Sequence, residues 1–420
     1  MNNALHTARI LLPRAGVALE KWAVVACDQF TAQPEYWQRA DALVGEAPSA
    51  LRLILPEAWL DEGEARIPAI HEAMAAYLAD GTLETAVADG FVLIERETAA
   101  GVRPGLVAAL DLEAYDFNPG SASLIRPTEG TVLERVPPRA RIRAGAPVEL
   151  PHVMMLIDDP DCTVIEPLLA RREGLRKLYD FELMLGGGHL RGWAVEGEAT
   201  RGVFDAIDAL NAKADGLLYA VGDGNHSLAA ARQCWLDLRD TLPPQARESH
   251  PARYALVELV NLACPALVFE PIHRALFSVD PVAVMDAYRE ALRADGAELG
   301  DGDDLVAFDG AGHTWRFRSA EHPLGRLQAF LDGWLAAHPE ARIDYIHGEA
   351  ALRSLVNRPD TLGIMPRAFD KGELFDAIRR HGVLPRKTFS MGEATEKRYY
   401  MEARRILNSD HYPQTNIINP

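Results

Sequence analysis

The chain has 420 residues, of which 48% are hydrophobic and 25% are charged. This composition is typical of folded globular proteins and excludes wholesale disorder, and the length allows two or three domains. The formal net charge of −18 disfavours non-specific binding to nucleic acid or to an anionic membrane, although a local basic pocket could still bind a small anion.

The four cysteines, Cys27, Cys162, Cys234 and Cys264, are scattered and show no zinc-binding spacing. The start of the chain lacks a basic segment followed by an apolar one, and no run approaches the roughly 18 apolar residues that a membrane span needs. We therefore expect a cytoplasmic protein with reduced thiols and no membrane partner.

Short apolar runs predict strands at residues 9–13 and 22–26, and Pro34 predicts the start of a helix. Asp28 and Gln29 directly follow the second run. Because α/β sheets bind ligands at the ends of their strands, both residues are candidates for contacting a substrate. The alternative is that Asp28 forms a turn and Gln29 is a solvated neighbour.

Residues 67–78 have helical spacing, the runs 91–94 and 105–110 predict a hairpin, and residues 116–123 predict an exposed loop. The next segment, 124–143, is basic within an acidic chain. It contains Arg126, Arg135, Arg139, Arg141 and Arg143. Guanidinium groups match phosphate and carboxylate geometry, so the segment predicts an anion site. Glu129 is a candidate general base or metal ligand there, and the alternative is a solvated edge in which Glu129 pairs with an arginine.

Residues 153–157 predict a buried strand that ends in Asp158 and Asp159. Paired carboxylates can bind Mg²⁺, which makes Asp158 a metal candidate, but they also form ordinary turns. A helix is expected at 165–178, a hairpin from 181–185 and 189–195, and a further helix at 203–213.

Residues 216–235 hold the most informative pattern. The apolar run 217–221 predicts a buried strand, the alanine-rich segment from Ser227 predicts a helix, and Gly222-Asp-Gly-Asn-His226 lies between them. The amides and dipole at a helix start favour an anion, and Gly222 and Gly224 permit a close backbone approach. This pattern predicts a phosphate site, and the alternative is a helix cap followed by a surface histidine.

Strands are also expected at 254–260, 265–269, 313–318, 343–346 and 361–365, and helices at 285–293, 327–337, 348–356 and 371–381. This alternation predicts an α/β or α+β fold with mixed sheets. We expect two regions. The first, 1–145, contains the hairpin and the arginine-rich segment, and the second, 146–420, forms a core with an insertion near 281–340.

The turn Asp223-Gly-Asn-His-Ser227 resembles the Asp-Gly-His-His-Arg type motif of the DUF1015 family. Other segments resemble blocks of the same family, so the resemblance covers most of the chain. They lie at residues 26–37, 126–131, 149–152, 177–181 and 344–348. The family resembles the ParB/sulfiredoxin superfamily, whose members place a Gly-x-His-Arg type turn on nucleotide phosphates. The resemblance implies a ParB/sulfiredoxin-like core built around the strand, the DGNHS turn and the helix.

Two departures from the superfamily pattern narrow the function. Sulfiredoxins carry a catalytic cysteine where this chain has Asn225, so thiol chemistry is not available at this turn. The final arginine of the motif is Ser227 here, so the arginines of 126–143 would have to supply the charge. A helix-turn-helix with a basic recognition helix is not recognisable, which opposes a ParB-like role in binding DNA.

The resemblance to free-serine kinases, which carry an Asp-Gly-His-His-Arg turn, implies a nucleotide-dependent kinase of free L-serine or a similar small hydroxylated metabolite. ATP or ADP and Mg²⁺ would take part. The implied catalytic residues are Glu129 as base, His226 and Asp223. The implied phosphate and nucleotide contacts are Gly222, Gly224, Asn225, Ser227, Arg126, Thr128 and Arg139. Asp223 is the implied metal ligand, and Asp158 stays a second metal candidate from its position after a strand.

Two other interpretations stay open. A non-catalytic nucleotide sensor would keep the glycine turn and the arginines but would need no base. Metal-dependent phosphoester hydrolysis would use Asp158, Asp159 and Asp223, but it lacks the expected spacing of His and Asp ligands. The expected partners are a nucleotide and a small substrate, and a homo-oligomer is left open.

Overall fold

The computed structural model describes residues 3–296, 300–319 and 321–407, and the chain forms two compact units. Unit 1 spans Met1–Leu267 and Glu393–Pro420, and unit 2 spans Val268–Gly392. Unit 1 is therefore assembled from two stretches of sequence. The boundary expected near residue 145 does not separate compact units, because it lies inside unit 1, where Arg143 and Glu149 on its two sides form an ion pair.

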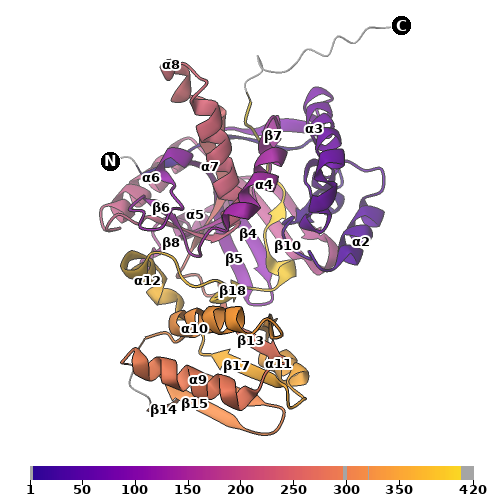
Figure 1. Cartoon of the computed structure of the whole chain (residues 1–420). Helices are drawn as coiled ribbons and strands as arrows, with labels where there is room; N and C mark the ends of the chain where they lie inside the picture. Colours follow the sequence, from indigo (N-terminus) through magenta and orange to yellow (C-terminus); the bar gives the residue numbers. More distant parts are fainter. Residues whose placement is uncertain (1–2, 297–299, 320, 408–420) are drawn as a thin grey trace. The chain divides into compact units, whose positions relative to one another are not determined.

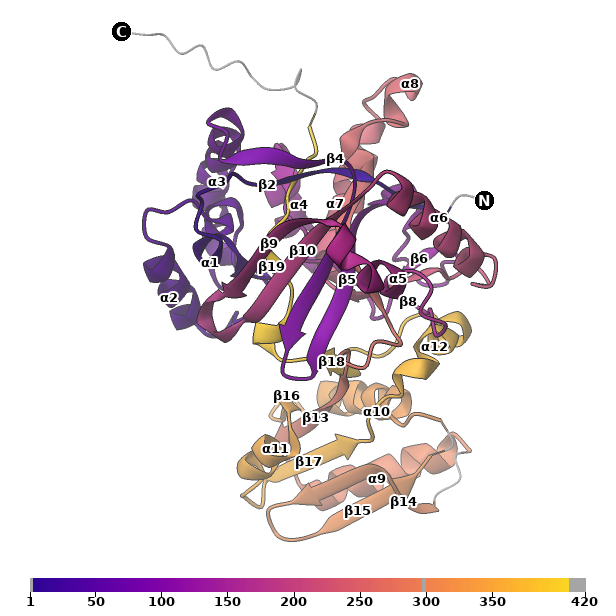
Figure 2. The same ribbon diagram turned by 180° about the vertical axis from the view of Figure 1, so that it is seen from behind.

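Unit 1 contains a mixed sheet that is ten-stranded in the described residues (Figure 1). Its strands are β1 (Leu5–His6), β2 (Ala8–Pro13), β4 (Leu83–Thr98), β5 (Gly101–Asp111), β6 (Ile125–Pro127), β8 (Met154–Ile157), β9 (Arg176–Leu183), β10 (Gly188–Glu196), β11 (Tyr219–Asp223) and β12 (Tyr254–Asn261). The order is β6-β11-β8-β12-β5-β4-β10-β9, with β1 paired to β5 and β2 to β4. The pairs β6/β11 and β8/β12 are parallel. Figure 2 shows β5, β10 and β9 from the opposite side.

Both faces of this sheet are buried. On β4, Phe91 and Leu93 belong to one hydrophobic core, whereas Val92 and Ile94 belong to the other. Successive side chains of a strand point to opposite faces, so a sheet covered on both sides needs apolar residues at every position. This explains why central segments such as β8 and residues 91–94 of β4 appear in the sequence as unbroken apolar runs.

Helices cover the two faces. Those of unit 1 are α1 (Leu19–Trp22), α2 (Pro34–Val44), α3 (Gly63–Ala79), α4 (Val136–Arg143), α5 (Glu166–Ala170), α6 (Glu198–Asn211), α7 (Asn225–Arg239) and α8 (Pro244–Arg247). Trp22, Trp37 and Met74 of α1, α2 and α3 belong to one core, and Ile207 and Trp235 of α6 and α7 belong to the other. Helix α4 packs along α7 (Figure 1).

The segment that follows unit 2 completes unit 1. Strand β19 (Tyr399–Tyr400) pairs with β3 (Val24–Val25), and β20 (Arg404–Arg405) pairs with β7 (Val148–Glu149). Arg398 is buried and donates to the Glu258 carboxylate at 2.6 Å and to Glu402. Buried charges are stable only when paired, so this segment is an integral part of the core of unit 1.

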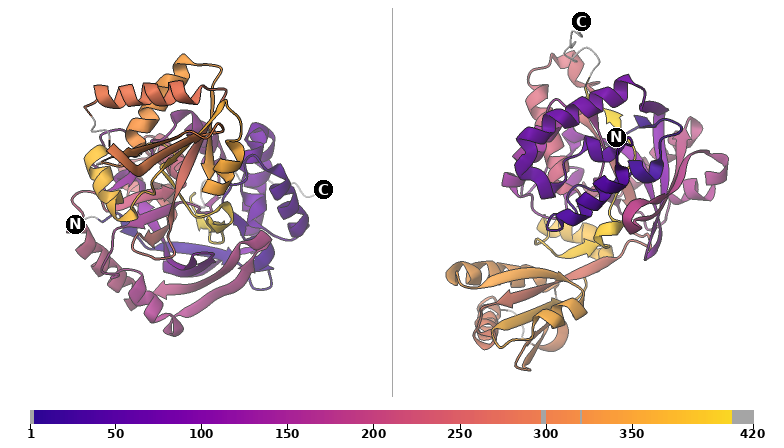
Figure 3. Two further views of the ribbon diagram at one scale, coloured as in Figure 1. Left: turned by 90° about the horizontal axis from the view of Figure 1, so that it is seen from below. Right: turned by 90° about the vertical axis from the view of Figure 1, so that its right-hand side faces the viewer.

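Unit 2 is an antiparallel sheet with helices packed against it, which both views of Figure 3 show in orange. Its strands are β13 (Phe269–Phe277), β14 (Gly300–Asp309), β15 (Thr314–Arg318), β16 (Arg342–His347), β17 (Thr361–Pro366) and β18 (Phe389–Met391), and its helices are α9 (Pro281–Ala294), α10 (Leu324–Ala337), α11 (Glu349–Leu355) and α12 (Leu374–His381). The order is β15-β14-β17-β13-β16, with β18 paired to β13. Tyr288 of α9, Trp315 of β15 and Leu331 of α10 belong to its larger core.

The expectation of an α/β (α+β) fold with mixed sheets is confirmed. Two expected elements are wrong. The helix predicted at 165–178 ends at Ala170, and Arg176 already begins β9, because pairing with β10 overrides the local helical spacing. The strand predicted at 265–269 begins only at Phe269, because Cys264 and Leu267 form a turn in which Leu267 N–H bonds to the Cys264 carbonyl at 3.1 Å. Within the residues described, no helix combines the length and apolar character of a membrane span.

Candidate functional site

The strand, glycine turn and helix expected at the centre of the sequence are present as β11 and α7. Gly224 caps α7 with φ 78°, a left-handed conformation that favours glycine. A side chain could not be accommodated here, because a Cβ atom on Gly224 would lie 3.0 Å from Cα of Val153 and 3.3 Å from Cδ2 of His152. A register shift between β11 and β8 places Gly222 at a bulge. The backbone path at Gly224 therefore favours glycine over any residue with a side chain.

The arginine-rich segment lies directly beside this turn. Strand β6 pairs in parallel with β11, and the Thr128 hydroxyl donates to the Val221 carbonyl at 2.8 Å. Asn225 Nδ2 donates to the Glu129 carbonyl at 2.9 Å. The Val132 N–H donates to Nε2 of His226 at 3.2 Å. The two segments that the sequence analysis singled out thus meet at the start of α7.

Several predicted site residues hold this loop in place. Asn225 accepts from the Tyr115 hydroxyl at 3.1 Å while it donates to the loop. Burial, and to a lesser extent the charges of Arg139 and Arg135, lower the pKa of His226 to about 4. His226 is therefore neutral near pH 7 and accepts a hydrogen bond, so its ring brings no positive charge to an anion.

His152 forms a hydrogen-bonded chain with two other side chains of unit 1. Its Nε2 lies 3.0 Å from Oγ of Ser227, and its Nδ1 lies 2.7 Å from the Tyr400 hydroxyl. Burial lowers the pKa of His152, with Asp28 and Asp223 acting in the opposite direction. The imidazole is therefore neutral near pH 7 and has both nitrogens engaged. The tautomer decides whether Ser227 donates to His152 or accepts from it.

Asp223 is an ion-paired carboxylate. Lys397 Nζ lies 3.1 Å from its Oδ2, and the Gly224 N–H donates to its Oδ1 at 2.9 Å. Burial alone would raise the pKa of Asp223, but Lys397, His152 and the Gly224 amide hold it below its ordinary value. The carboxylate is ionised, and both oxygens already have partners.

The predicted metal candidates do not come together. Strands β8 and β11 are antiparallel, and Asp223 pairs with Met154 at the start of β8. Asp158 follows the other end of β8, four residues beyond Met154. At about 3.3 Å per residue, the backbones of Asp158 and Asp223 are therefore roughly 13 Å apart. Asp159 accepts from the Thr163 and Val164 amides at 2.6 and 2.9 Å, which makes it a turn former. Across the described ranges, no three His, Cys, Asp or Glu residues form a group that could hold a metal ion. The side chains do not fit a resident Mg²⁺.

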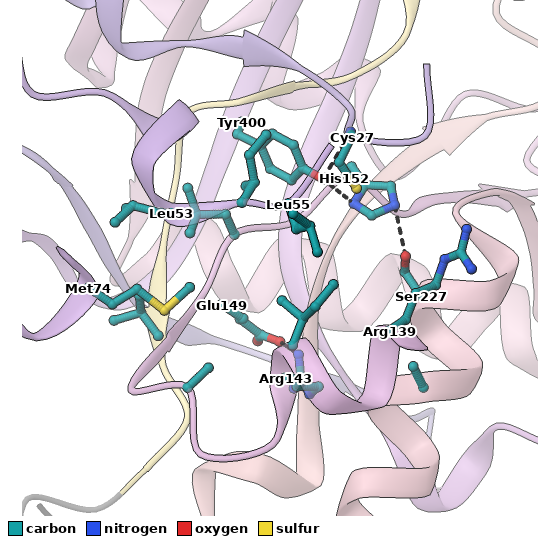
Figure 4. A pocket seen from close by; sticks show the side chains of 16 residues that line it. Cys27, Leu53, Leu55, Met74, Arg139, Arg143, Glu149, His152, Ser227 and Tyr400 are labelled. Atoms are coloured by element: carbon teal, nitrogen blue, oxygen red, sulfur yellow. Dashed lines mark hydrogen bonds and ion pairs between the residues drawn. The ribbon is translucent and has the colours of Figure 1, made fainter. Parts of the chain in front are cut away.

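A cavity of about 130 Å³ lies next to Ser227 and His152 (Figure 4). Ser227, His152, Tyr400 and Cys27 line its polar side. Burial raises the pKa of Cys27 to about 12, so this thiol is not a nucleophile. The remaining lining is mainly apolar and includes Leu53, Leu55, Met74, Ile142 and Val148.

Two arginines also line the cavity. Arg139 pairs with Glu57, and Arg143 Nη1 lies 2.5 Å from Oε2 of Glu149. The other terminal nitrogen of Arg143, Nη2, is buried and has no hydrogen-bond partner among the residues that the structure describes. A buried guanidinium nitrogen without a partner is costly, which makes Arg143 a candidate contact for an anionic ligand.

The remaining predicted residues lie around this centre. Asp28 is close enough to His152 to raise its pKa, and Gln29 donates to Asp28 at 3.0 Å. Arg126 donates to the Ser121 carbonyl at 3.3 Å, and neither Arg126 nor Glu129 lines the cavity.

The sequence analysis missed three residues of the site: His152, Lys397 and Tyr400. His152 had a signal, because it ends the block Glu149-Leu-Pro-His152. The other two had none, because they lie beyond unit 2 in a stretch without a motif.

The sequence matches the family model of DUF1015, a protein of unknown function, over residues 11–348. The chain therefore belongs to the DUF1015 family. No curated protein matches it.

Solved structures give distant likenesses. A free serine kinase variant in complex with ADP is 10% identical, with 73% of this chain and 94% of that chain covered and a TM-score of 0.39. The free serine kinase in complex with AMP is also 10% identical, with 73% and 93% covered and a TM-score of 0.38. A conserved hypothetical protein from Pyrococcus furiosus is 10% identical, with 73% and 97% covered and a TM-score of 0.35. At such TM-scores the likenesses do not assign a function to this chain.

Proposed function

We propose that this protein is a nucleotide-dependent phosphotransferase that acts on a small hydroxylated metabolite. The observation that carries the proposal is the start of α7. Ser227 N–H bonds to the Gly224 carbonyl at 3.0 Å, and helix geometry leaves the amides of Asn225 and His226 without intrahelical acceptors. Together with the helix dipole, these amides favour a phosphate group.

The surroundings of this turn support transfer rather than binding alone. Ser227 is part of α7 and also lines the cavity beside it, so a phosphate at the helix start would lie next to a second ligand. Phosphoryl transfer needs mainly this positioning and charge neutralisation, and Lys397 and Arg139 are the nearby cations. The motif resemblance makes ATP or ADP the donors to test and free L-serine the first acceptor.

Two groups are candidates for taking the acceptor's proton. Glu129 is the base that the sequence predicts, and its carbonyl is bound to Asn225 beside the turn. His152 is a neutral imidazole at the cavity. A Mg²⁺ ion that arrives with the nucleotide would neutralise phosphate charge, but no step here depends on it.

The test is incubation of the full-length protein with ATP or ADP, separately and with or without Mg²⁺. A pool of amino acids, hydroxy acids and polyols supplies the acceptor, and mass spectrometry detects any product heavier by one phosphoryl group. Glu129→Gln and His152→Gln are measured in parallel. We expect a phosphorylated product, with a rate that falls about 100-fold or more in the variant that lacks the base.

Two results would contradict the proposal in different ways. Nucleotide binding in a thermal shift without any product would favour the non-catalytic nucleotide sensor, for which Glu129→Gln should change nothing. Absence of both binding and product would remove the phosphate site at α7 altogether.

A further inference from the structure

The cavity beside Ser227 has a chemical character of its own. The described residues that line it present hydroxyl and imidazole groups on one side with Arg139 near them, Arg143 at another place, and aliphatic side chains over most of the rest (Figure 4). In Figure 4, His152 and Ser227 lie apart from the Arg143–Glu149 pair. The cavity therefore offers separate partners for a hydroxyl group, an anionic group and a hydrocarbon body.

We propose that this cavity is the acceptor site of the phosphotransferase and that its acceptor is a small aliphatic hydroxy acid rather than an amino acid. Its carboxylate would bind Arg143, its hydroxyl would meet Ser227 and His152, and its hydrocarbon body would pack on Leu53, Leu55 and Met74. The inference rests on the proposed function, because it names the acceptor class of the same site.

The size of the cavity limits the acceptor. A cavity of about 150 Å³ accommodates benzene, which has six heavy atoms, so about 130 Å³ suits a molecule of similar size. A whole nucleotide is far too large. The nucleotide would therefore lie outside the cavity, with its terminal phosphate at the start of α7.

An ammonium group would find no free carboxylate among the described residues that line the cavity. Glu149 is the acidic residue among those that line it, and both of its carboxylate oxygens already accept hydrogen bonds. Oε1 accepts from Arg404 at 2.6 Å and from the Leu256 N–H at 2.9 Å, and Oε2 accepts from Arg143. Desolvating an ammonium group without a carboxylate is unfavourable, whereas a carboxylate would meet the guanidinium group of Arg143, which lines the cavity and whose buried Nη2 has no partner among the described residues. The cavity should therefore bind a hydroxy acid, which has no ammonium group, more tightly than serine.

The reaction balances with the groups at hand. The acceptor oxygen forms a bond to the terminal phosphorus, and the bond between that phosphorus and the bridging oxygen of the nucleotide breaks. The nucleotide leaves with one phosphoryl group fewer. The hydroxyl proton passes through the Ser227 hydroxyl to Nε2 of His152, which lies 3.0 Å from it.

This proton path defines the state of His152. Nδ1 must carry a hydrogen and donate it to the Tyr400 oxygen, so that Nε2 is free to accept. The imidazolium that forms would face Asp28 and Asp223, two carboxylates that raise the pKa of His152 and partly offset the lowering by burial, Arg139 and Arg398. Glu129 does not line the cavity, so His152 is the residue placed to take the proton.

The experiment compares two acceptors that differ in one group. β-Hydroxyisobutyrate is L-serine with a methyl group in place of the ammonium group, and both are assayed for phosphoryl transfer with the nucleotide that the protein binds. We expect kcat/KM for β-hydroxyisobutyrate to exceed that for L-serine by at least about tenfold, because only serine leaves a buried charge without a partner. Isobutyrate, which lacks the hydroxyl, should compete without being phosphorylated.

Arg143→Lys supplies the matched variant. It keeps a positive charge beside Glu149 but removes the second terminal nitrogen, so the KM for β-hydroxyisobutyrate should rise by about tenfold while nucleotide affinity stays constant. Arg141→Lys, at an exposed position of the same helix that does not line the cavity, should change neither value.

The outcomes separate this inference from the proposed function. Phosphorylation of L-serine in preference to β-hydroxyisobutyrate, or an unchanged KM in Arg143→Lys, would overturn the acceptor class and leave the phosphotransferase intact. Nucleotide binding without transfer to any acceptor would overturn both. Transfer to β-hydroxyisobutyrate that depends on Arg143 but not on Arg141 would establish the site.

Discussion

Oγ of Ser227 lies 3.0 Å from Nε2 of His152, although the two residues are 75 positions apart in the sequence. Ser227 lies in the first turn of α7, and His152 precedes β8, the strand that pairs with β11 in the sheet. This contact joins the start of the helix, where an anion would bind, to the cavity beside it. The stability and binding properties of unit 1 should therefore respond together to changes around this pair.

Replacement of Gly224 by alanine should destabilise the protein and weaken nucleotide binding. A Cβ atom at this left-handed position would lie 3.0 Å from Val153 Cα, so both the backbone strain and the contact oppose it. We expect a loss of about 1–3 kcal/mol in the free energy of unfolding, measured by chemical denaturation. Nucleotide affinity, measured by calorimetry, should fall as well.

Gly197→Ala is the matched control for this variant. Gly197 also caps a helix, α6, with φ 61°, but a Cβ atom there would meet nothing within 4 Å. Gly197→Ala should lower the free energy of unfolding through backbone strain alone and should leave nucleotide affinity unchanged. Equal effects of the two substitutions on nucleotide affinity would contradict a ligand site at Gly224.

Tyr400→Phe tests how much the hydrogen bonds of the Tyr400 hydroxyl contribute to the stability of unit 1. The phenol binds Nδ1 of His152 at 2.7 Å and accepts from the Cys27 N–H at 3.3 Å. Its removal leaves buried polar groups unsatisfied, so the free energy of unfolding should fall by about 1–3 kcal/mol. Tyr254→Phe, which removes a more exposed bond to the Glu248 carbonyl, should cost less than about 0.5 kcal/mol. A smaller loss in Tyr400→Phe than in this control would be inconsistent with the structure.

Arg398→Met tests the buried ion pairs behind the site. Arg398 binds Glu258 at 2.6 Å, Glu402 and the Pro151 carbonyl, all out of solvent. Loss of the cation leaves buried carboxylates short of a partner and should cost about 3–5 kcal/mol in denaturation. Arg398→Lys keeps the charge and should cost less, which preserves a measurement if the methionine variant does not fold.

The surface pair of Arg176 with Glu196 provides the contrast for this prediction. Its two side chains are 52% and 39% exposed, so Arg176→Met should cost only about 0–1 kcal/mol. A loss in Arg398→Met no greater than this would show that the buried cluster contributes little to folding.

His226 should make the protein less stable at acidic pH. Its folded pKa of about 4 lies below the ordinary value of 6.5, so the unfolded chain binds the proton first as the pH falls. Stability from this source is intact above about pH 6.5 and is lost between about 6.5 and 4, by an amount on the order of 1–2 kcal/mol once solvent screening of a half-buried ring is allowed for. His226→Gln should remove this part of the pH dependence between those limits. An identical pH dependence in both proteins would contradict the assignment.

The local parts of the site were predictable from the sequence. A short apolar run, two glycines and an alanine-rich segment predict β11, the turn and α7, because each signal acts within a few residues. The resemblance of 26–37, 126–131 and 149–152 to family blocks also pointed to segments that the sheet brings together around this turn.

The distant parts were not predictable. Tyr400 meets His152 across 248 positions, and nothing in the residues near Tyr400 specifies that contact. Asp223 ends β11, and Asp158 directly follows β8. Only the antiparallel pairing of these two strands shows that the two carboxylates lie at opposite ends of the pair. Strand direction depends on the whole sheet, so a pattern of strand ends in a sequence does not define a common site.

The return of residues 393–407 to unit 1 has a consequence for the order in which the protein can be made. Glu258 and Glu149 are synthesised well before Arg398 and Arg404, the cations that neutralise them inside unit 1. A nascent chain that stops after unit 2 would hold these acids without those partners and would lack Tyr400 at the cavity. The site is thus complete only after the last segment has been synthesised, and a chain that ends before Arg398 should be more susceptible to proteolysis than the full-length protein.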